Sequence, residues 1–561
     1  MTILRSHPRD WLAALVAGAF YSLTFAPGPL PQWLLPAVQL GILAWLARTT
    51  LYAPSATHAA WRGWFFGLGA FTVGLYWLTI SMSRYGGMPW VLSATALVLL
   101  SAYLALFPAL ALSVSKFLCK PFIHLLGNSL TLSASAGLGF IFIWASCWTL
   151  TEWLRGSLFT GFPWLNTAYG QVDSWLAGWS IVGGTYAVVW LTALVAAALM
   201  VTFDSQRSIK KITPYIAVTA VIVGTLINTM TFTQPAGDAL RIRLIQGNID
   251  QSEKFTPTQW GSAVQRYLDL AQHKQPEQTI TPQLIMMPET MMVKFPHDID
   301  ASTWQSLIDI AQKDQATILL GSPLLNRPAR QYTNSIIAVT GQNTPEQFIT
   351  FGQVLPKNGN QTIPRYDKQH LVPFGEFVPF GFRWFVDMMH IPLGDFTSGV
   401  SPQAPFTVGQ QHIAANICYE DIFGEELLAP IRSTANPSLG ATILANFSNL
   451  GWFGDSWALR QHWQMARLRA IETARPVVRA TNTGMTGAID HKGRTVAFLK
   501  PLQAGYLDVT IQGQRGLTPY TVWGDLPILI LVGFILLGAG ILTVRQRRIQ
   551  TNPDTHHDPT T

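Results

Sequence analysis

Charged side chains are scarce in this chain. Asp, Glu, Lys and Arg make up 12% of its 561 residues, whereas about 25% is usual for soluble proteins. The shortage is uneven, because residues 10–235 consist mostly of long apolar runs while residues 240–512 have the composition of a globular domain. The sequence therefore predicts two regions, one embedded in lipid and one exposed to water.

Cysteine is also rare, with Cys119, Cys147 and Cys418 as its only occurrences. Their spacing matches no metal-ligand motif, and a disulfide framework is not expected. The histidines are scattered and no phosphate-cradling glycine loop is present, so we expect no metal and no organic cofactor. The net charge of +7 does not indicate nucleic acid, since no basic cluster has interleaved aromatic residues.

Long apolar runs dominate the N-terminal region. A bilayer core about 30 Å thick needs roughly 20 apolar helical residues, and lipid offers no partner for backbone polar groups, so helices are expected. No convincing cleavage site follows the first run, which is therefore predicted to be a retained span. The eight predicted spans lie near residues 10–27, 30–49, 60–82, 88–114, 136–156, 173–203, 212–233 and 525–544.

Basic residues predict the orientation of these spans. In an eight-span arrangement, twelve basic residues fall on one side of the membrane, and among the short loops only Arg84 and Arg155 fall on the other. Because Lys and Arg accumulate in cytoplasmic loops, both termini are predicted to be cytoplasmic, and residues 234–524 to lie outside, in the periplasm if the cell has one. The twelve are Arg5, Arg9, Arg48, Arg62, Lys116, Lys120, Arg207, Lys210, Lys211, Arg545, Arg547 and Arg548.

The outer segment 151–166 is aromatic and apolar although it should face the membrane interface. Its aromatic residues could form an ordinary interfacial belt, or they could form a lip that guides acyl chains to a site. Glu152 and Arg155 lie three residues apart, on one face of a helix. We expect a local ion pair there rather than catalysis.

The sequence of the water-exposed region predicts an α/β domain, because short strand-like runs alternate with amphipathic helical patterns. Several strands are apolar throughout, as in a sheet covered on both faces. The predicted strands are 241–246, 284–287, 317–320, 335–339, 412–418, 442–445 and 477–480, and the predicted helices are near 257–272, 301–313, 422–433 and 457–474.

Three residues in this domain could carry chemistry. Glu289 follows an apolar strand and a proline, so its carboxylate would emerge at a strand end, placed for proton transfer. Lys368 lies beyond a polar loop. Cys418 ends an apolar strand just ahead of a helix, whose N-terminus would favour a thiolate. Taken singly, each has an ordinary alternative: an exposed loop carboxylate, a solvated lysine and a buried structural cysteine.

Together these residues resemble a known signature. Pro288-Glu289, Tyr366-Asp-Lys368 and Ile417-Cys418 resemble the Glu-Lys-Cys triad of the nitrilase superfamily in order and spacing. The surrounding motifs, with seven spans before and one after the domain, are similar to the apolipoprotein N-acyltransferase family over almost the whole chain. These motifs are Gln246-Gly-Asn-Ile249, Lys368-Gln-His-Leu-Val-Pro-Phe-Gly-Glu376 and Gln461-His-Trp-Gln-Met-Ala-Arg-Leu-Arg-Ala470.

The resemblance implies a fold and a set of roles. The fold would be a membrane α-helical bundle of eight spans joined to an α/β nitrilase-like α-β-β-α sandwich. Glu289 would be the general base, Lys368 the stabiliser of the oxyanion and Cys418 the nucleophile. A base is needed because a thiol with a pKa of about 8.5 is only slightly ionised at neutral pH.

The resemblance also implies substrates. A membrane phospholipid would donate an acyl chain to form a thioester on Cys418, and the α-amino group of a diacylglyceryl-modified apolipoprotein would accept it, in a bacterial inner membrane. Auxiliary residues would be Glu376 beside the triad, and Tyr419 and Glu420 beside the nucleophile. One departure is Phe255, where the family usually has Trp; the ring is kept and the indole donor is lost.

The expected domain organisation follows from these regions. Residues 1–235 would form the seven-span domain, 236–515 the periplasmic catalytic domain, 516–548 the last span and 549–561 a disordered cytoplasmic tail. Two alternatives use the same residues. A membrane-tethered amidase or nitrilase would transfer the acyl group to water, which does not explain seven spans, and a non-catalytic scaffold would not need all three triad residues.

Overall fold

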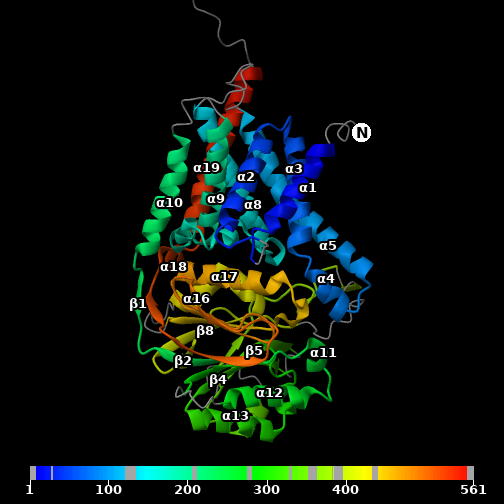
Figure 1. The fold of residues 1–561 in the computed structure, drawn as a ribbon, viewed down its shortest axis with the longest axis vertical. Helices are drawn as coiled ribbons and strands as arrows, with labels where there is room; N and C mark the ends of the chain where they lie inside the picture. Colours follow the sequence, from blue (N-terminus) through cyan, green and yellow to red (C-terminus); the bar gives the residue numbers. More distant parts are fainter. Residues whose placement is uncertain are drawn as a thin grey trace, which may run out of the picture. The chain divides into compact units, whose positions relative to one another are not determined.

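The computed structural model describes residues 8–26, 30–120, 134–204, 212–273, 281–326, 331–351, 363–381, 383–384, 396–432 and 440–551. Arg5, Arg207, Lys210 and Lys211, which were used to predict the orientation, lie outside these residues, as does segment 552–561 of the predicted tail. The chain divides into two compact units. One comprises residues 1–76, 95–230 and 523–561, and the other residues 77–94 and 231–522 (Figure 1).

The first unit is helical. Each of the eight stretches predicted to span a membrane contains a helix, although most are shorter than the predicted run. Residues Trp90–Leu118, Trp175–Phe203 and Leu526–Gln546 are long and apolar enough to cross a membrane, and a bent pair, Ala56–Gly74 with Leu78–Tyr85, would make a fourth span if counted as one. The helices are α1 (Pro8–Ser22), α2 (Leu35–Leu51), α3 (Ala56–Gly74), α6 (Leu106–Leu118), α8 (Ala134–Ser157), α9 (Ser180–Asp204), α10 (Thr213–Thr229), α19 (Leu526–Thr551) and most of α5 (Trp90–Leu104).

Glycine allows the closest helix contacts in this unit. A Cβ atom at Gly18 of α1 would lie 1.9 Å from the carbonyl oxygen of Phe66, and one at Gly69 of α3 would lie 2.0 Å from that of Leu15. Larger residues would force α1 and α3 apart. Such small-residue contacts hold helices together in lipid, where the hydrophobic effect does not.

The ion pair predicted within segment 151–166 is confirmed. Arg155 Nη2 lies 2.6 Å from Glu152 Oε2, and Arg155 Nη1 donates to the carbonyl oxygen of Trp164 at 2.8 Å. The pair therefore anchors the following loop. Trp164 is buried, whereas Phe159 is 86% exposed, which fits either an aromatic belt or a lipid-facing lip.

At its C-terminal end the first unit departs from the prediction of a disordered tail. α19 continues to Thr551, so residues 549–551 are helical. Since α19 is one uninterrupted helix from Leu526 to Thr551, its regular backbone hydrogen bonding extends about two turns beyond the apolar run that identified the span.

The second unit contains two six-stranded sheets, whose strand orders are β13-β2-β3-β4-β5-β6 and β12-β11-β10-β9-β8-β7. In each sheet three consecutive parallel strands, β2-β3-β4 and β8-β9-β10, have antiparallel neighbours. The first sheet comprises β2 (Leu240–Gln246), β3 (Leu284–Met286), β4 (Thr317–Asn326), β5 (Gln331–Val339), β6 (Arg365–Asp367) and β13 (Gly505–Ile511). The second comprises β7 (Phe406–Val408), β8 (Gln411–Ile417), β9 (Ile443–Ser448), β10 (Val477–Thr481), β11 (Gly487–Ile489) and β12 (Thr495–Phe498), and β1 (Thr233–Pro235) pairs separately with β14 (Gln514–Gly516).

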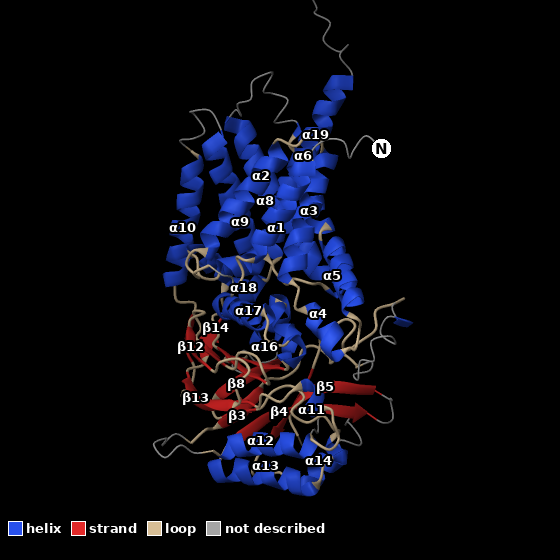
Figure 2. Cartoon of the chain, turned by 45° about the vertical axis from the view of Figure 1, so that its right-hand side comes forward, coloured by secondary structure: helices blue, strands red, loops and turns tan. Residues whose placement is uncertain are grey.

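Three buried cores arrange this unit as helix, sheet, sheet and helix layers (Figure 2). Apolar side chains from both sheets, such as Leu244 and Ile417, form the central core. The outer face of the first sheet packs on α12 and α13, for example through Trp304, and that of the second packs on α16 and α17, for example through Trp463. The helices are α11 (Gln251–Lys254), α12 (Trp260–Gln272), α13 (Ala301–Asp314), α14 (Pro345–Phe351), α16 (Leu428–Arg432), α17 (Trp457–Thr473) and α18 (Pro519–Trp523).

All seven predicted strands are present, and so are three of the four predicted helices. The helix predicted over 422–433 is wrong in its first half, where the chain forms two 3-10 helices, η8 (Cys418–Ile422) and η9 (Gly424–Leu427), before α16. β6, β7, β11, β12, β13 and the two-stranded β1-β14 pair were not predicted. All but β13 are only three or four residues long and so carry little periodicity, whereas the seven-residue β13 was missed.

Candidate active site

The candidate residues Glu289, Lys368 and Cys418 all follow the carboxyl end of a strand. Glu289 comes after β3, Lys368 after β6 and Cys418 after β8. Since β3 and β8 lie in the parallel parts of the two facing sheets, their carboxyl ends are the position at which sheets of this kind usually carry their sites.

Glu289 and Lys368 form a buried ion pair together with Glu376. Lys368 Nζ lies 2.8 Å from Glu376 Oε1 and 3.6 Å from Glu289 Oε1. Lys368 is 1% exposed and each glutamate is 6% exposed. The alternatives of an exposed carboxylate and a solvated lysine are therefore wrong. One ammonium lies between two carboxylates in a site shielded from water.

Asn334 of β5 links the two carboxylates and was not predicted. Its Nδ2 donates to Glu289 Oε1 at 2.8 Å and to Glu376 Oε1 at 3.0 Å. Each second carboxylate oxygen accepts one backbone N–H, from Asn449 at 2.8 Å in Glu289 and from Val372 at 2.9 Å in Glu376. The two glutamates thus have matching sets of partners. A polar residue just before the apolar run 335–339 was the only sequence signal for Asn334.

Gly321 of β4 makes room for Glu289. A Cβ atom at this position would lie 2.5 Å from the backbone nitrogen of Thr290 and 2.7 Å from the Cα atom of Glu289. Both are backbone atoms, so a side chain at residue 321 would displace the turn that carries the carboxylate. Close backbone approach is a common reason for glycine within a strand.

Cys418 starts the helix η8 with a φ of 52°, a left-handed conformation that residues with a Cβ atom rarely adopt. The side chain is partly exposed and packs against the central core. The sharp turn directly follows β8, and backbone strain of this kind tends to cluster at functional sites.

The charges around Cys418 keep its thiol protonated. Burial raises the pKa of the thiol well above its ordinary value, the carboxylates of Glu289 and Glu376 raise it further, and Lys368 lowers it. The net direction for the thiol in the free protein is therefore opposite to that expected from a helix N-terminus alone. Burial lowers the pKa of Lys368, but Glu376, Glu289 and Cys418 raise it by more, so this lysine is a permanent cation.

Glu420 organises the backbone around the nucleophile. Its Oε2 accepts from the Ile417 N–H at 2.6 Å and from the Tyr366 hydroxyl at 2.9 Å, and its Oε1 accepts from the N–H groups of Gln369 and His370. Burial raises its pKa to about 7, opposed by Lys368 and by these N–H donors. The carboxylate therefore ties the turn at Cys418 to the loop after Lys368.

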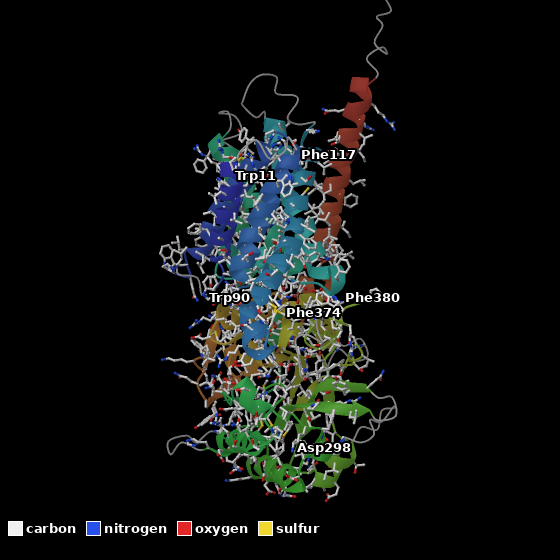
Figure 3. All side chains as sticks on the ribbon, turned by 90° about the vertical axis from the view of Figure 1, so that its right-hand side faces the viewer. Trp11, Trp90, Phe117, Asp298, Phe374 and Phe380 are labelled. Atoms are coloured by element: carbon white, nitrogen blue, oxygen red, sulfur yellow. The ribbon has the colours of Figure 1, made fainter. Side chains whose placement is uncertain are left out.

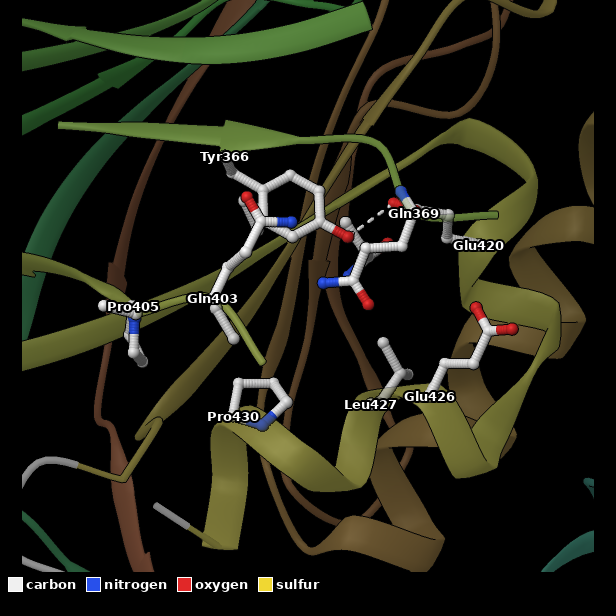
Figure 4. A pocket seen from close by; sticks show the side chains of 12 residues that line it. Tyr366, Gln369, Gln403, Pro405, Glu420, Glu426, Leu427 and Pro430 are labelled. Carbon is white, nitrogen blue, oxygen red and sulfur yellow. Dashed lines mark hydrogen bonds between the residues drawn. The ribbon is translucent and has the colours of Figure 1, made fainter. Parts of the chain in front are cut away.

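A small pocket next to Glu420 is lined by residues that include Tyr366, Gln369, Gln403 and Glu426 (Figure 4). The Tyr366 hydroxyl points at Glu420 there. Glu289, Lys368 and Cys418 are not among the residues that line it.

Aromatic residues at and near the predicted auxiliary positions contact one another. Tyr419 packs edge-on against Phe423, with ring centroids 5.1 Å apart. Phe255, just after α11, contacts Trp452 at 6.1 Å, and Trp452 also contacts Tyr85 at 5.7 Å. The ring at residue 255 thus retains an aromatic partner without an indole donor.

Segment 77–94 overlaps the ends of two predicted spans, 60–82 and 88–114, and contains the loop between them, yet it belongs to the same unit as the strands. It contains a π-helical turn, Ser81–Tyr85, and Arg84 pairs with Asp250 at 3.3 Å. Trp90 and Phe380 in this unit have exposed side chains, 75% and 103% exposed respectively (Figure 3).

Lys254 is a buried cation near the carboxylate of Glu289. Its Nζ donates to the Thr290 hydroxyl at 2.9 Å and to the Glu289 carbonyl oxygen at 3.3 Å. Burial lowers its pKa to about 7, and Glu289 opposes that change. Among the described residues, no group of three His, Cys, Asp or Glu side chains could hold a metal ion.

Two family models match the chain. The model described as the apolipoprotein N-acyltransferase N-terminal domain matches residues 17–198, and the carbon-nitrogen hydrolase model matches residues 241–520. The second match covers the unit with the two sheets and every candidate residue. A nitrilase-like domain is thereby shown for this region.

Similar proteins extend over nearly the whole chain. An apolipoprotein N-acyltransferase from Bordetella bronchiseptica is 45% identical over 540 residues, which are 95% of this chain and 96% of that protein. One from Ralstonia nicotianae is 39% identical over 533 residues, covering 95% and 92%. Among solved structures, an amidase from Nesterenkonia sp. is 18% identical and covers 49% of this chain and 91% of that chain, with a TM-score of 0.33.

Proposed function

The chain belongs to the apolipoprotein N-acyltransferase family, and we propose that it transfers an acyl chain from a membrane phospholipid to an apolipoprotein through a thioester on Cys418. It is an acyltransferase of lipoprotein maturation with a carbon-nitrogen hydrolase domain. The acceptor is the α-amino group of a diacylglyceryl-modified cysteine. The observation that carries the role of Cys418 is its partly exposed thiol beside the buried Glu289 and Lys368 pair.

In the first half-reaction Glu289 takes the thiol proton as Cys418 Sγ attacks the ester carbonyl of the phospholipid. The carbonyl oxygen becomes an oxyanion, which the Lys368 ammonium stabilises. Such preorganised charge usually contributes most to acyl transfer. The tetrahedral intermediate collapses, the ester C–O bond breaks, and the proton on Glu289 passes to the departing oxygen, leaving a lysophospholipid and a Cys418 thioester.

In the second half-reaction the neutral amine attacks the thioester carbonyl. Glu289 takes a proton from the attacking nitrogen, and Lys368 again stabilises the oxyanion. The C–S bond then breaks, and Glu289 returns the proton to Cys418, so the thiol is restored and an amide is formed. A buried general base serves both halves because its carboxylate is regenerated each time.

The auxiliary residues keep this geometry. Glu376 holds Lys368 at 2.8 Å, so the ammonium stays in place when Glu289 is protonated. Glu420 holds the turn that carries the nucleophile, while Tyr419 and Phe255 supply aromatic walls. These roles explain why polar groups that do not react are buried beside the thiol.

We further propose eight spans in a bacterial inner membrane, with both termini cytoplasmic and the catalytic domain in the periplasm. Residues 1–235 would form the membrane domain, 236–515 the catalytic domain, 516–548 the last span and 549–561 the cytoplasmic tail. The contact between Arg84 and Asp250 supports this topology, because it brings a loop predicted to lie outside together with the catalytic domain.

A membrane-impermeant maleimide should label Ser262→Cys but not Thr560→Cys in intact cells carrying Cys418→Ala; the reverse pattern would contradict the orientation.

The thioester is tested directly with labelled phospholipid. Label should accumulate on Cys418 in the absence of acceptor, be released by hydroxylamine, and move to the amine of a diacylglyceryl lipopeptide when this is added. Cys418→Ala should fold and insert but take up no label. Wild-type turnover in that variant would contradict the assignment, and label that reaches water but never the amine would favour a membrane-tethered hydrolase.

A further inference from the structure

Three buried polar side chains lie behind the nucleophile without a role in the reaction. Asp421 comes from η8, His462 from α17 and Arg479 from β10, and they are 2%, 1% and 1% exposed. Asp421 Oδ1 accepts from His462 Nε2, and Asp421 Oδ2 accepts from Arg479 Nη1. Arg479 Nη2 lies 3.0 Å from His462 Nδ1. Each side chain thus contacts the other two, which closes a triangle.

The partners determine how this cluster is protonated. A guanidinium only donates hydrogen bonds, so His462 Nδ1 accepts and the ring proton lies on Nε2, facing Asp421. Burial lowers the pKa of His462, against the effect of Asp421. Burial alone would raise the pKa of Asp421, but His462 and Arg479 lower it by more. The cluster is therefore an aspartate anion, a neutral imidazole and an arginine cation.

The cluster reaches the nucleophile through the backbone. The carbonyl oxygen of Cys418 accepts from Asn446 Nδ2 at 3.1 Å. Asp421 lies in the same five-residue helix that Cys418 begins. Left-handed backbone at a residue with a Cβ atom persists only where its surroundings hold it, and here both ends of the turn are held.

We propose that Asp421, His462 and Arg479 are positioning residues that hold Cys418 in the conformation from which its thiol attacks the phospholipid. They act through the turn and do not contact the reacting atoms. Glu420 restrains the same turn from the other side, through Ile417. The proposal rests on the proposed role of Cys418 as the nucleophile.

Substitutions at His462 separate hydrogen bonding from packing and from proton transfer. His462→Leu fills the space but removes both hydrogen bonds, whereas a glutamine carboxamide can donate to Asp421 and accept from Arg479. We expect His462→Leu to slow labelling of Cys418 by phospholipid in a single turnover by at least about tenfold, because small misplacements of reacting groups are costly. The KM for phospholipid should not change. His462→Gln should react at close to the wild-type rate.

His412→Leu is the matched control, since His412 lies on β8, the strand that leads into Cys418, but is partly exposed and outside the cluster. Alkylation of Cys418 by iodoacetamide should follow the same order in all variants, and it requires no lipid. Melting temperatures in detergent report whether each variant is folded. If His462→Leu does not fold, Asp421→Asn replaces it. The amide nitrogen of the new asparagine would face the Arg479 donor, so this variant should show the same loss of labelling rate.

The outcomes separate this proposal from the assignment of the nucleophile. Absence of label on Cys418 in the wild type would refute the nucleophile and leave the cluster without the proposed role. Label on wild-type Cys418 together with a wild-type rate in folded His462→Leu, or in Asp421→Asn where that variant replaces it, would overturn the positioning role alone. So would a folded His462→Gln as slow as His462→Leu, because the imidazole would then be needed for proton transfer rather than for its hydrogen bonds.

Discussion

Replacement of Glu289 by glutamine tests the general base most directly. The change removes one proton acceptor and one charge while keeping nearly the same shape. In either orientation the new amide nitrogen meets a donor, because Oε1 faces Asn334 and Lys368 whereas Oε2 faces the Asn449 N–H. A buried donor without an acceptor costs roughly 1–3 kcal/mol, so we expect Glu289→Gln to lower the free energy of unfolding by about that amount.

The effect on chemistry should be larger. A positioned general base contributes roughly 10²–10⁴-fold, which corresponds to about 2.7–5.4 kcal/mol of activation free energy. Because the Glu289 carboxylate raises the pKa of Cys418, its removal should also lower the thiol pKa. The variant should therefore form thiolate at a lower pH than the wild type and yet acylate more slowly at neutral pH.

Glu376→Gln is a matched control for this prediction. Glu376 also presents one oxygen to Lys368 and Asn334 and the other to a backbone N–H, so the substitution creates the same conflict between donors and removes the same charge. It does not remove the proposed base. We expect its loss of acylation rate to be smaller than that of Glu289→Gln at a similar melting temperature.

The assay is single-turnover labelling of Cys418 by phospholipid between pH 6 and pH 9. In Glu289→Gln the rate should climb about tenfold per pH unit until the thiol is ionised, because hydroxide then replaces the missing base. Glu376→Gln should not show this recovery. Equal losses in the two variants with the same pH dependence would refute the assignment of Glu289 as the base.

Three further predictions concern neighbouring residues. Gly321→Ala should lower the free energy of unfolding by roughly 1–3 kcal/mol and slow acylation, since its Cβ atom would meet the backbone of Glu289. The control, Gly261→Ala in α12, has open space around it and should raise the free energy of unfolding by roughly 0.5–1 kcal/mol. Equal effects of the two variants in denaturant titrations would contradict the close approach of residue 321 to the Glu289 backbone. Folding lowers the pKa of Lys254 from 10.5 to about 7, so the free energy of unfolding should rise by up to roughly 5 kcal/mol as the pH increases across that window. Lys254→Met should abolish this rise, and an unchanged pH dependence would show that the lysine stays charged. Phe255→Ala should lower the free energy of unfolding by roughly 0.5–1.5 kcal/mol more than the loss of buried apolar area alone would, because it also removes the ring contact with Trp452. Phe255→Trp should retain the stability of the wild type. A drop in melting temperature for both variants would show that the site excludes the larger ring.

Periodicity and motif spacing predicted seven strands and three helices of the catalytic domain correctly. Each of the seven predicted strands contains at least three apolar residues within a short run, whereas three-residue strands such as β6 and β11 are too short to show a pattern. The helix predicted from residue 422 was placed correctly only from Leu428, because the turn at Cys418 continues into 3-10 geometry. Local preference did not reveal that change.

In the membrane region, too, some features were predicted from the sequence and others depended on tertiary contacts. A helix is present in each predicted apolar run, since backbone polar groups in lipid must be paired within the segment. The ion pair of Glu152 and Arg155 also followed from spacing along one helix. Segment 77–94, however, groups with the catalytic unit, and composition could not reveal this because it depends on tertiary contacts such as that of Arg84 with Asp250.

The sequence by itself determined the kinds of region in this protein, the order of its strands and helices, and the identity of Glu289, Lys368 and Cys418 as candidates. These properties reside in local pattern and in motifs. Only the tertiary structure decided what surrounds the thiol: Asn334 between two carboxylates, a lysine held as a cation, and the cluster of Asp421, His462 and Arg479 behind the turn. Such groups come together from distant parts of the chain, and burial, which sets their protonation, is a property of the folded domain.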